Sequence, residues 1–165
     1  MDARAFARRH RSKLAAAAVA LAVAGAASLY WFQPHKLFFD SHAEAERPTE
    51  GGTLARGSFR SLEHQTSGNA LLIELPDGRR LLRLEDLKTS NGPELRVYLS
   101  SVPAQDDWFV YDDGPFLDLG DLAGNVGSSN YELPAGVDPA PYISAVVWCR
   151  RFGVGFGVAP LARQP

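Results

Sequence analysis

Residues 69–84 have the sequence Asn-Ala-Leu-Leu-Ile-Glu-Leu-Pro-Asp-Gly-Arg-Arg-Leu-Leu-Arg-Leu. Two runs rich in aliphatic residues, 69–75 and 80–84, flank the triplet Pro76-Asp77-Gly78. Proline presets φ for a turn, and glycine accepts the positive φ that tight turns require. This stretch therefore predicts two antiparallel strands joined by a short turn.

The same pattern recurs along the rest of the chain between turn residues such as Ser90-Asn91-Gly92-Pro93. No window of ten or more residues in this part shows a sustained helical period. The sequence predicts one all-β domain over residues 54–161, built as an antiparallel β-sandwich or a partly closed barrel. The further runs that we expect to be strands are 55–62, 94–99, 109–119, 131–133, 142–149 and 154–161.

The N-terminal part has a different composition. Residues 14–32 carry no charge and include nine alanines, and they end in Tyr30-Trp31-Phe32. Nineteen residues of helix approximately match the hydrocarbon core of a bilayer. Residues 1–13 contain five basic side chains against one acidic one, which predicts a cytoplasmic tail by the positive-inside rule. We expect a single-pass transmembrane anchor at 14–32 in contact with the lipid bilayer, with the following domain outside the cell membrane.

A cleavable signal peptide is the alternative for this segment. Residues 14–23 would then form its apolar region, and Ala24-Gly25-Ala26 would supply the cleavage site. Both interpretations deliver the C-terminal domain to an extracytoplasmic compartment. Residues 33–53 are polar and carry a Gly51-Gly52 pair, which is typical of a juxtamembrane linker.

Charge and motifs exclude several classes of function. Residues 33–165 keep 12 of the 17 basic and 18 of the 19 acidic residues, so no basic surface for nucleic acid is expected. The chain has no hydrolase or P-loop motif. Its single cysteine cannot supply a c-type haem attachment or an iron–sulfur cluster, and the sequence requires no other cofactor and predicts no metal site.

Cys149 is the chain's one cysteine, and it lies where the apolar run 142–149 meets Arg150 and Arg151. An unpaired cysteine outside the cytoplasm is a buried structural thiol, half of an intermolecular disulfide, or a reactive group. Alternation along the run places Cys149 on an apolar face, which favours an inert thiol. The two arginines favour the opposite interpretation, a thiolate whose pKa they lower.

Several ordered motifs together resemble the DM-thirteen domain family, the electron-transfer DM module of Skeletor-type proteins. The resemblance covers nearly all of residues 54–161, and the chain looks like a membrane-anchored single-domain member. It implies a β-rich extracytoplasmic domain with an electron-transfer role, in which Cys149 is the redox centre acting with an unidentified partner. The motifs are GSF at 57–59, LLRLEDLKTSNGPELRVYL at 81–99, LGDLAGNVG at 119–127, NYELP at 130–134, VWC at 147–149 and FGVA at 156–159.

Two functional hypotheses follow from different classes. The first is a membrane-tethered redox protein centred on Cys149, with Arg150 and Arg151 as thiolate stabilisers. The second is a non-catalytic cell-surface module that binds protein, carbohydrate or another ligand. The sequence leaves open whether the redox hypothesis would make this protein an enzyme.

Two local patterns suggest further sites. Six aspartates between 106 and 121 are interleaved with aromatic residues, and they form either a calcium site or a solvated edge. In 152–159, phenylalanine and valine alternate with glycine and alanine. The glycine face either receives a flat ligand or is filled by an aromatic neighbour such as Trp108 or Trp148.

Overall fold

The computed structural model describes residues 11–34, 36 and 39–164, and the chain divides into two units, Met1–His35 and Lys36–Pro165. The described part of the first unit is dominated by helix α2 (Arg11–Phe32). Alanine and leucine have the highest helix propensities, so the apolar run forms a continuous helix of about 33 Å.

Helix α2 contains the whole of the predicted span 14–32, and it is long and apolar enough to cross a membrane. Its apolar side chains are exposed along its length. A membrane anchor and a signal sequence share these properties. Residues 1–10 of the predicted basic tail lie outside the described residues, and Arg11 and Lys13 stand in the first turn of α2.

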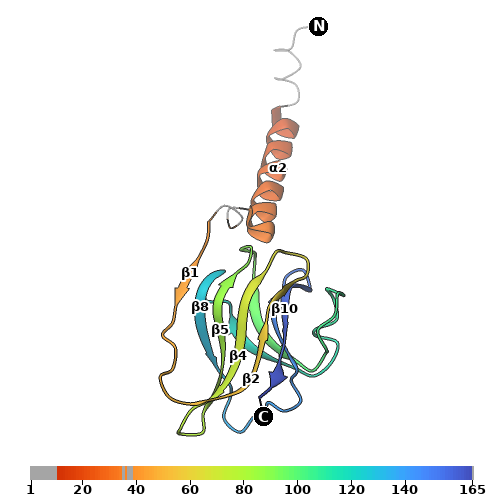
Figure 1. The fold of residues 1–165 in the computed structure, drawn as a ribbon. Coiled ribbons are helices and arrows are strands. Elements are labelled where there is room, and N and C mark those ends of the chain that lie inside the picture. Colours follow the sequence, from red (N-terminus) through yellow and green to blue (C-terminus); the bar gives the residue numbers. More distant parts are fainter. Residues whose placement is uncertain (1–10, 35, 37–38, 165) are drawn as a thin grey trace. The chain divides into compact units, whose positions relative to one another are not determined.

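The second unit contains two open sheets. In the first sheet the strand order is β1-β8-β5-β4-β2-β11, and Figure 1 shows β1 to β2 side by side in this order. The β4–β5 hairpin is the one predicted from 69–84, and Gly78 adopts a φ of 82° in its turn. The strands of this sheet are β1 (His42–Glu44), β8 (Val126–Glu132), β5 (Arg80–Lys88), β4 (Ser67–Glu74), β2 (Gly52–Ser58) and β11 (Ala162–Arg163).

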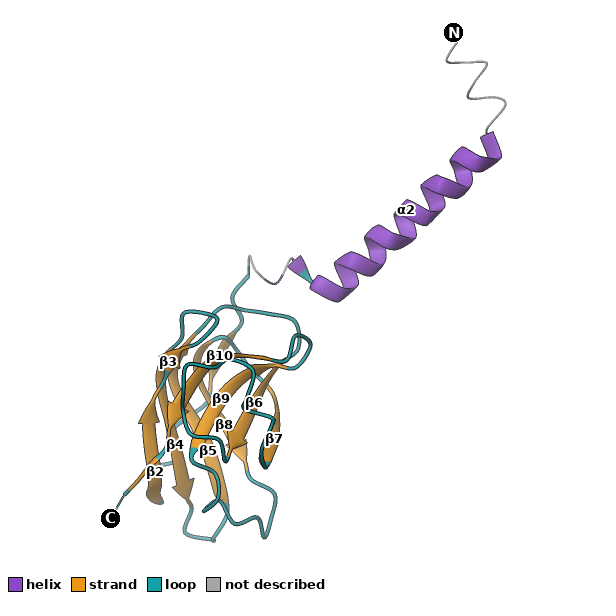
Figure 2. Cartoon of the chain, turned by 90° about the vertical axis from the view of Figure 1, so that its right-hand side faces the viewer, coloured by secondary structure: helices purple, strands orange, loops and turns teal. Residues whose placement is uncertain are grey.

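The second sheet has the order β3-β10-β9-β6-β7 and is shown in Figure 2. Apart from the parallel pair β1–β8, the strand pairs of the described chain are antiparallel. The predicted all-β fold is therefore confirmed as a two-sheet β-sandwich that does not close into a barrel. The strands are β3 (Arg60–Ser61), β10 (Val154–Pro160), β9 (Ser144–Cys149), β6 (Leu95–Ser100) and β7 (Phe116–Asp121).

The main core lies between the two sheets. It combines aliphatic side chains of β4 and β5 with those of β6 and β9, including Leu72, Leu82, Val97 and Val147. Alternation along each strand sends every second residue into this layer. Cys149 belongs to the same cluster.

The opposite face of the second sheet is covered as well. Tyr98, Val146 and Trp148 pack there against Tyr111, which comes from the segment 101–115. The Ser100 hydroxyl at the end of β6 donates to the Tyr111 carbonyl oxygen at 2.8 Å, which fixes this segment against the sheet. As a result, all six residues of β9 are buried.

The structure differs from the sequence-based expectation in two segments. The predicted strand 109–119 begins only at Phe116, because the residues before it turn back across the sheet face. Within the predicted linker 33–53, β1 pairs with β8, and the buried Arg83 guanidinium donates to the carbonyl oxygens of Ala45 and Glu46. Backbone pairing and polar side chains such as Arg83 hold this segment, and neither produces an apolar pattern in the sequence.

The alternation predicted for 152–159 is wrong, because the β9–β10 register shifts between Gly155 and Gly157. Phe156 and Ala159 therefore join the core between the sheets, while Val158 lies on the opposite face. The space beside Gly155 is occupied by Leu62, the backbone of Trp108 and the aromatic ring of Tyr111, and the space beside Gly157 is occupied by Thr66. A Cβ at Gly155 would lie 2.7 Å from Leu62 Cδ1 and 3.5 Å from the Trp108 carbonyl oxygen.

We expect Gly155→Val to destabilise the domain by about 1–3 kcal/mol, because it overpacks a filled site. Gly52→Val is the matched control, since it lies on a strand with nothing within 4 Å of its added Cβ. Urea unfolding followed by tryptophan fluorescence compares the two variants. Equal stability of both variants would contradict the close packing described for β10.

Candidate functional site

Cys149 is the last residue of β9, the middle strand of the second sheet. Its neighbours across the sheet are Leu95 on β6 and Val154 on β10. A tight turn follows, in which the Gly153 N–H donates to the Cys149 carbonyl oxygen at 2.9 Å. The side chain is completely buried.

The sulfur is covered by the loop that precedes β6. Cys149 Sγ donates to the carbonyl oxygen of Pro93 at 3.1 Å. The Arg150 N–H donates to the Glu94 carbonyl oxygen at 3.1 Å. We call residues 91–94 the cap, because they lie over the end of β9 and meet both the thiol and the residue after it.

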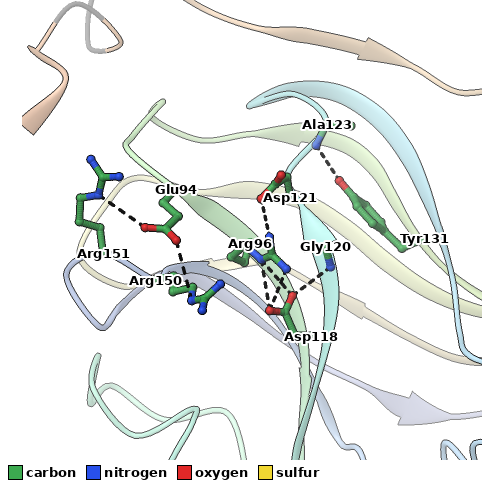
Figure 3. Close-up of polar contacts among 9 residues, drawn as sticks. All are labelled: Glu94, Arg96, Asp118, Gly120, Asp121, Ala123, Tyr131, Arg150 and Arg151. Atoms are coloured by element: carbon green, nitrogen blue, oxygen red, sulfur yellow. Dashed lines mark hydrogen bonds and ion pairs between the residues drawn. The ribbon is translucent and has the colours of Figure 1, made fainter. Parts of the chain in front are cut away.

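The cap is tied down at each end. At its start, the Asn91 side-chain amide donates to the Phe39 carbonyl oxygen at 2.9 Å, and Gly92 lies against the ring of Phe156. At its end, the Glu94 carboxylate is 3.5 Å from Arg151 Nε and 3.8 Å from Arg150 Nε (Figure 3). These contacts join the cap to the turn that follows the cysteine.

Glu94 has a φ of 59°, in the left-handed region that residues with a side chain rarely adopt. Such a conformation costs about 1–2 kcal/mol relative to the ordinary one. The carboxylate's ion pairs and the two backbone bonds of the cap offset this cost. The closed cap therefore depends on contacts that can be removed one at a time.

The electrostatics of Cys149 are opposite to the sequence-based hypothesis. Burial raises the pKa of the thiol, and backbone N–H groups of Phe152 and Arg151 directed at the sulfur offset this only in part. The expectation that Arg150 and Arg151 hold this pKa below its ordinary value is therefore wrong for the closed structure. The Glu94 carboxylate, which approaches both guanidinium groups, also raises this pKa, whereas the charge of Arg151 lowers it without reversing the effect of burial.

Several aspartates of the acidic stretch 106–121 pair with arginine side chains. Arg96 pairs with Asp118 at 2.9 Å and with Asp121 at 2.6 Å, as Figure 3 shows. Asp106 lies 3.5 Å from Arg60. Within residues 11–34, 36 and 39–164, no group of three or more His, Cys, Asp or Glu side chains is placed to hold a metal ion.

Sequence reasoning located Cys149, Arg150 and Arg151 but missed the roles of Pro93 and Glu94. The turn at 90–93 was predicted, and it does connect β5 with β6. Its contact with the thiol joins residues 56 positions apart. The sequence did contain a signal for this contact. A glutamate directly follows the predicted Asn-Gly-Pro turn, and two arginines that could pair with it follow the one cysteine.

The raised thiol pKa makes a prediction about alkaline stability. Because folding favours the protonated thiol, its stabilising contribution is complete below the ordinary pKa of 9.0 and is lost as the pH rises toward the folded-state value. The free energy of unfolding should therefore fall above pH 9 more steeply in the wild type than in Cys149→Ala, by up to about 1.4 kcal/mol per pH unit.

Urea unfolding of both proteins between neutral pH and about pH 10.5 measures this difference. Burial also raises the pKa of Tyr98, so that residue contributes a similar alkaline loss. Because Tyr98 is present in both proteins, the comparison isolates Cys149. If the free energy of unfolding falls equally steeply with pH in both proteins, the thiol titrates in the folded protein as it does in the unfolded chain.

Comparison with known proteins supports the resemblance seen in the motifs. No curated protein and no solved structure matches the chain. One family model, described as electron transfer DM13, matches residues 58–161, which include both sheets' central strands, the cap and Cys149. The chain therefore belongs to the electron transfer DM13 family.

Proposed function

We propose that this protein is a membrane-tethered extracytoplasmic electron carrier whose working group is the Cys149 thiol, protected at rest by the cap. Membership of the electron-transfer family supports a redox role. The observation that carries the assignment to this residue is its position. The chain's one thiol lies at a strand end beneath a loop held by two backbone bonds and the Glu94 ion pairs.

The reaction is thiol–disulfide exchange with two partners. Cys149 loses its proton, and its thiolate attacks a disulfide of an oxidant protein, forming a mixed disulfide and releasing the other partner sulfur as a thiolate. A dithiol of a reductant protein then attacks the Cys149 sulfur and releases the first partner. The second thiol of the reductant closes its own disulfide and frees Cys149. Two electrons pass from the dithiol to the disulfide.

In this proposal, each group around the thiol has a part in the reaction. The closed cap keeps the thiol protonated and dry, because burial raises its pKa. When the cap opens, water enters, and the N–H groups of Arg151 and Phe152 directed at the sulfur stabilise the thiolate. Opening also frees the two guanidinium groups from Glu94, and their positive charge then favours the thiolate.

The cap hypothesis predicts that Glu94→Gln accelerates alkylation of native Cys149 about two- to tenfold, because exposed ion pairs of this kind contribute little but measurable free energy. The double variant Arg150→Gln/Arg151→Gln should also accelerate it. Iodoacetamide labelling of the folded full-length protein at pH 8, read by mass spectrometry, gives the rates.

Glu132→Gln serves as the control, because it removes a comparable surface pair with Arg79 at 3.3 Å at the end of β8, in the sheet that does not contain Cys149. If the arginines act mainly as thiolate stabilisers, the double variant will react more slowly than the wild type. That outcome would reject the cap as their principal role.

The exchange hypothesis predicts a trapped intermediate in cells. Rapid acid quenching and alkylation of free thiols should preserve a mixed disulfide of Cys149, visible as a larger species on a non-reducing gel. We expect this species in the carbonate-resistant membrane fraction, because α2 has the length and composition of an anchor. The Cys149→Ala protein should lack it.

A reducing gel controls for non-disulfide adducts, and mass spectrometry identifies the partner cysteine. Complete recovery of Cys149 as a free thiol in the quenched wild type would contradict the exchange reaction. Recovery of the chain in the carbonate supernatant would contradict the membrane tether and leave the exchange reaction to be judged separately by the gel.

A further inference from the structure

A polar cleft of about 580 Å³ lies at one end of the sandwich, and Asn91, the first residue of the cap, is among its lining residues. Its walls come from the start of β4, the end of β5 and the residues near Asp40. Seven of its nine lining residues are neutral and polar, and five of these carry hydroxyl groups. The volume lies within the range of small-ligand sites.

Buried hydroxyl groups form the floor of the cleft. Thr66 Oγ1 and Thr89 Oγ1 are 2.8 Å apart, and Thr66 Oγ1 donates to the Phe156 carbonyl oxygen at 3.0 Å. Both threonines are 6 % exposed. The carbonyl oxygens of Phe156 and His64, at 3.0 Å and 3.2 Å, both lie within reach of the one Thr66 hydroxyl proton. When that proton goes to either carbonyl, Thr89 donates to Thr66 and the Thr89 oxygen keeps acceptor capacity for a ligand hydroxyl.

Gly157 explains why this floor can form. A Cβ at this position would lie 2.5 Å from the Cβ of Thr66, so the threonine rests directly on the backbone of β10. Gly157 therefore belongs to the glycine face that the sequence singled out. Its neighbour is a cleft residue, and a larger side chain would displace it.

One wall of the cleft is rigidly attached. The Asn125 side chain is 1 % exposed and donates to Asp40 Oδ1 at 2.7 Å and to the Thr89 carbonyl oxygen at 2.9 Å. Its own oxygen accepts from the Ser41 N–H at 2.7 Å. This one buried amide holds the segment 40–41 against the end of β5.

We infer that the cleft binds a small neutral ligand rich in hydroxyl groups, of the size of a mono- or disaccharide. Hydroxyl side chains both donate and accept, which matches the hydroxyl groups of such a ligand. The two charged lining residues, Asp40 and Lys88, have opposite signs and so select no net charge. Among the described residues that line the cleft, none has an aromatic or large aliphatic side chain to favour an apolar ligand.

The test uses the full-length protein in phosphocholine-detergent micelles, which carry no sugar headgroup. Glucose, N-acetylglucosamine, maltose and myo-inositol serve as probes at millimolar concentration. Saturation-transfer NMR detects the bound ligand, and amide shifts of Ser67, Thr89 and Ser90 locate it. We expect transfer to at least one probe together with shifts at these amides.

Two variants should weaken binding about three- to tenfold, as expected for one lost hydrogen bond. Thr89→Val removes the buried acceptor, and Lys88→Met removes an exposed donor without disturbing the core. Thr53→Val on β2 is the matched control, and it should bind as the wild type does. The inference does not depend on the redox proposal, because Cys149→Ala should bind equally well.

Three outcomes would overturn the inference. The first is no transfer to any probe from the folded wild type. The second is binding as strong as that of the wild type by both the Lys88→Met protein and the Thr89→Val protein, with the Thr89→Val protein shown to be folded. The third is a response of the cleft amides to inorganic phosphate but to none of the saccharides.

Discussion

Strand β9 is buried on both faces, and this constraint determines how its cysteine can act. One face of the strand contributes to the core between the sheets, and the other packs under Tyr111 and the segment 101–115. Its neighbours β6 and β10 occupy both edges. A partner can therefore approach Cys149 only from the end of the strand, where the cap lies.

Under the proposed function, the cap makes an otherwise inert position controllable. A thiol in the middle of β9 would need the sandwich to unfold before it could react, whereas a thiol at the strand end needs only residues 91–94 to move. The left-handed Glu94 and its ion pairs with Arg150 and Arg151 make that movement a local event. In this proposal the Cys149 thiol is buried when the cap is closed and reactive when the cap is open.

The fold and the position of the thiol could be predicted from the sequence, because both follow from local patterns. The Pro76-Asp77-Gly78 turn and the period-two aliphatic runs defined the strands, and alternation placed Cys149 in the core. The function of Arg150 and Arg151 could not be predicted in this way. Their proximity to the cysteine suggested a dominant electrostatic effect, but burial and the charge of Glu94, 56 residues before Arg150, both raise the thiol pKa. The bulge at Gly155 and Gly157 was likewise invisible, because register depends on the partner strand.

The account's central claim is that Cys149 becomes accessible by opening of the cap and not by unfolding of the sandwich. The most direct test compares two protection factors in the folded protein: that of Cys149 against alkylation and that of the Arg150 amide, which donates to Glu94, against hydrogen exchange. The amide of Val147, in the middle of β9, reports opening of the sheet itself. The account predicts that Cys149 and Arg150 give the same opening equilibrium and that Val147 is protected far more strongly. Protection of Cys149 equal to that of Val147 would show that the thiol reacts only on global unfolding, and it would contradict the account.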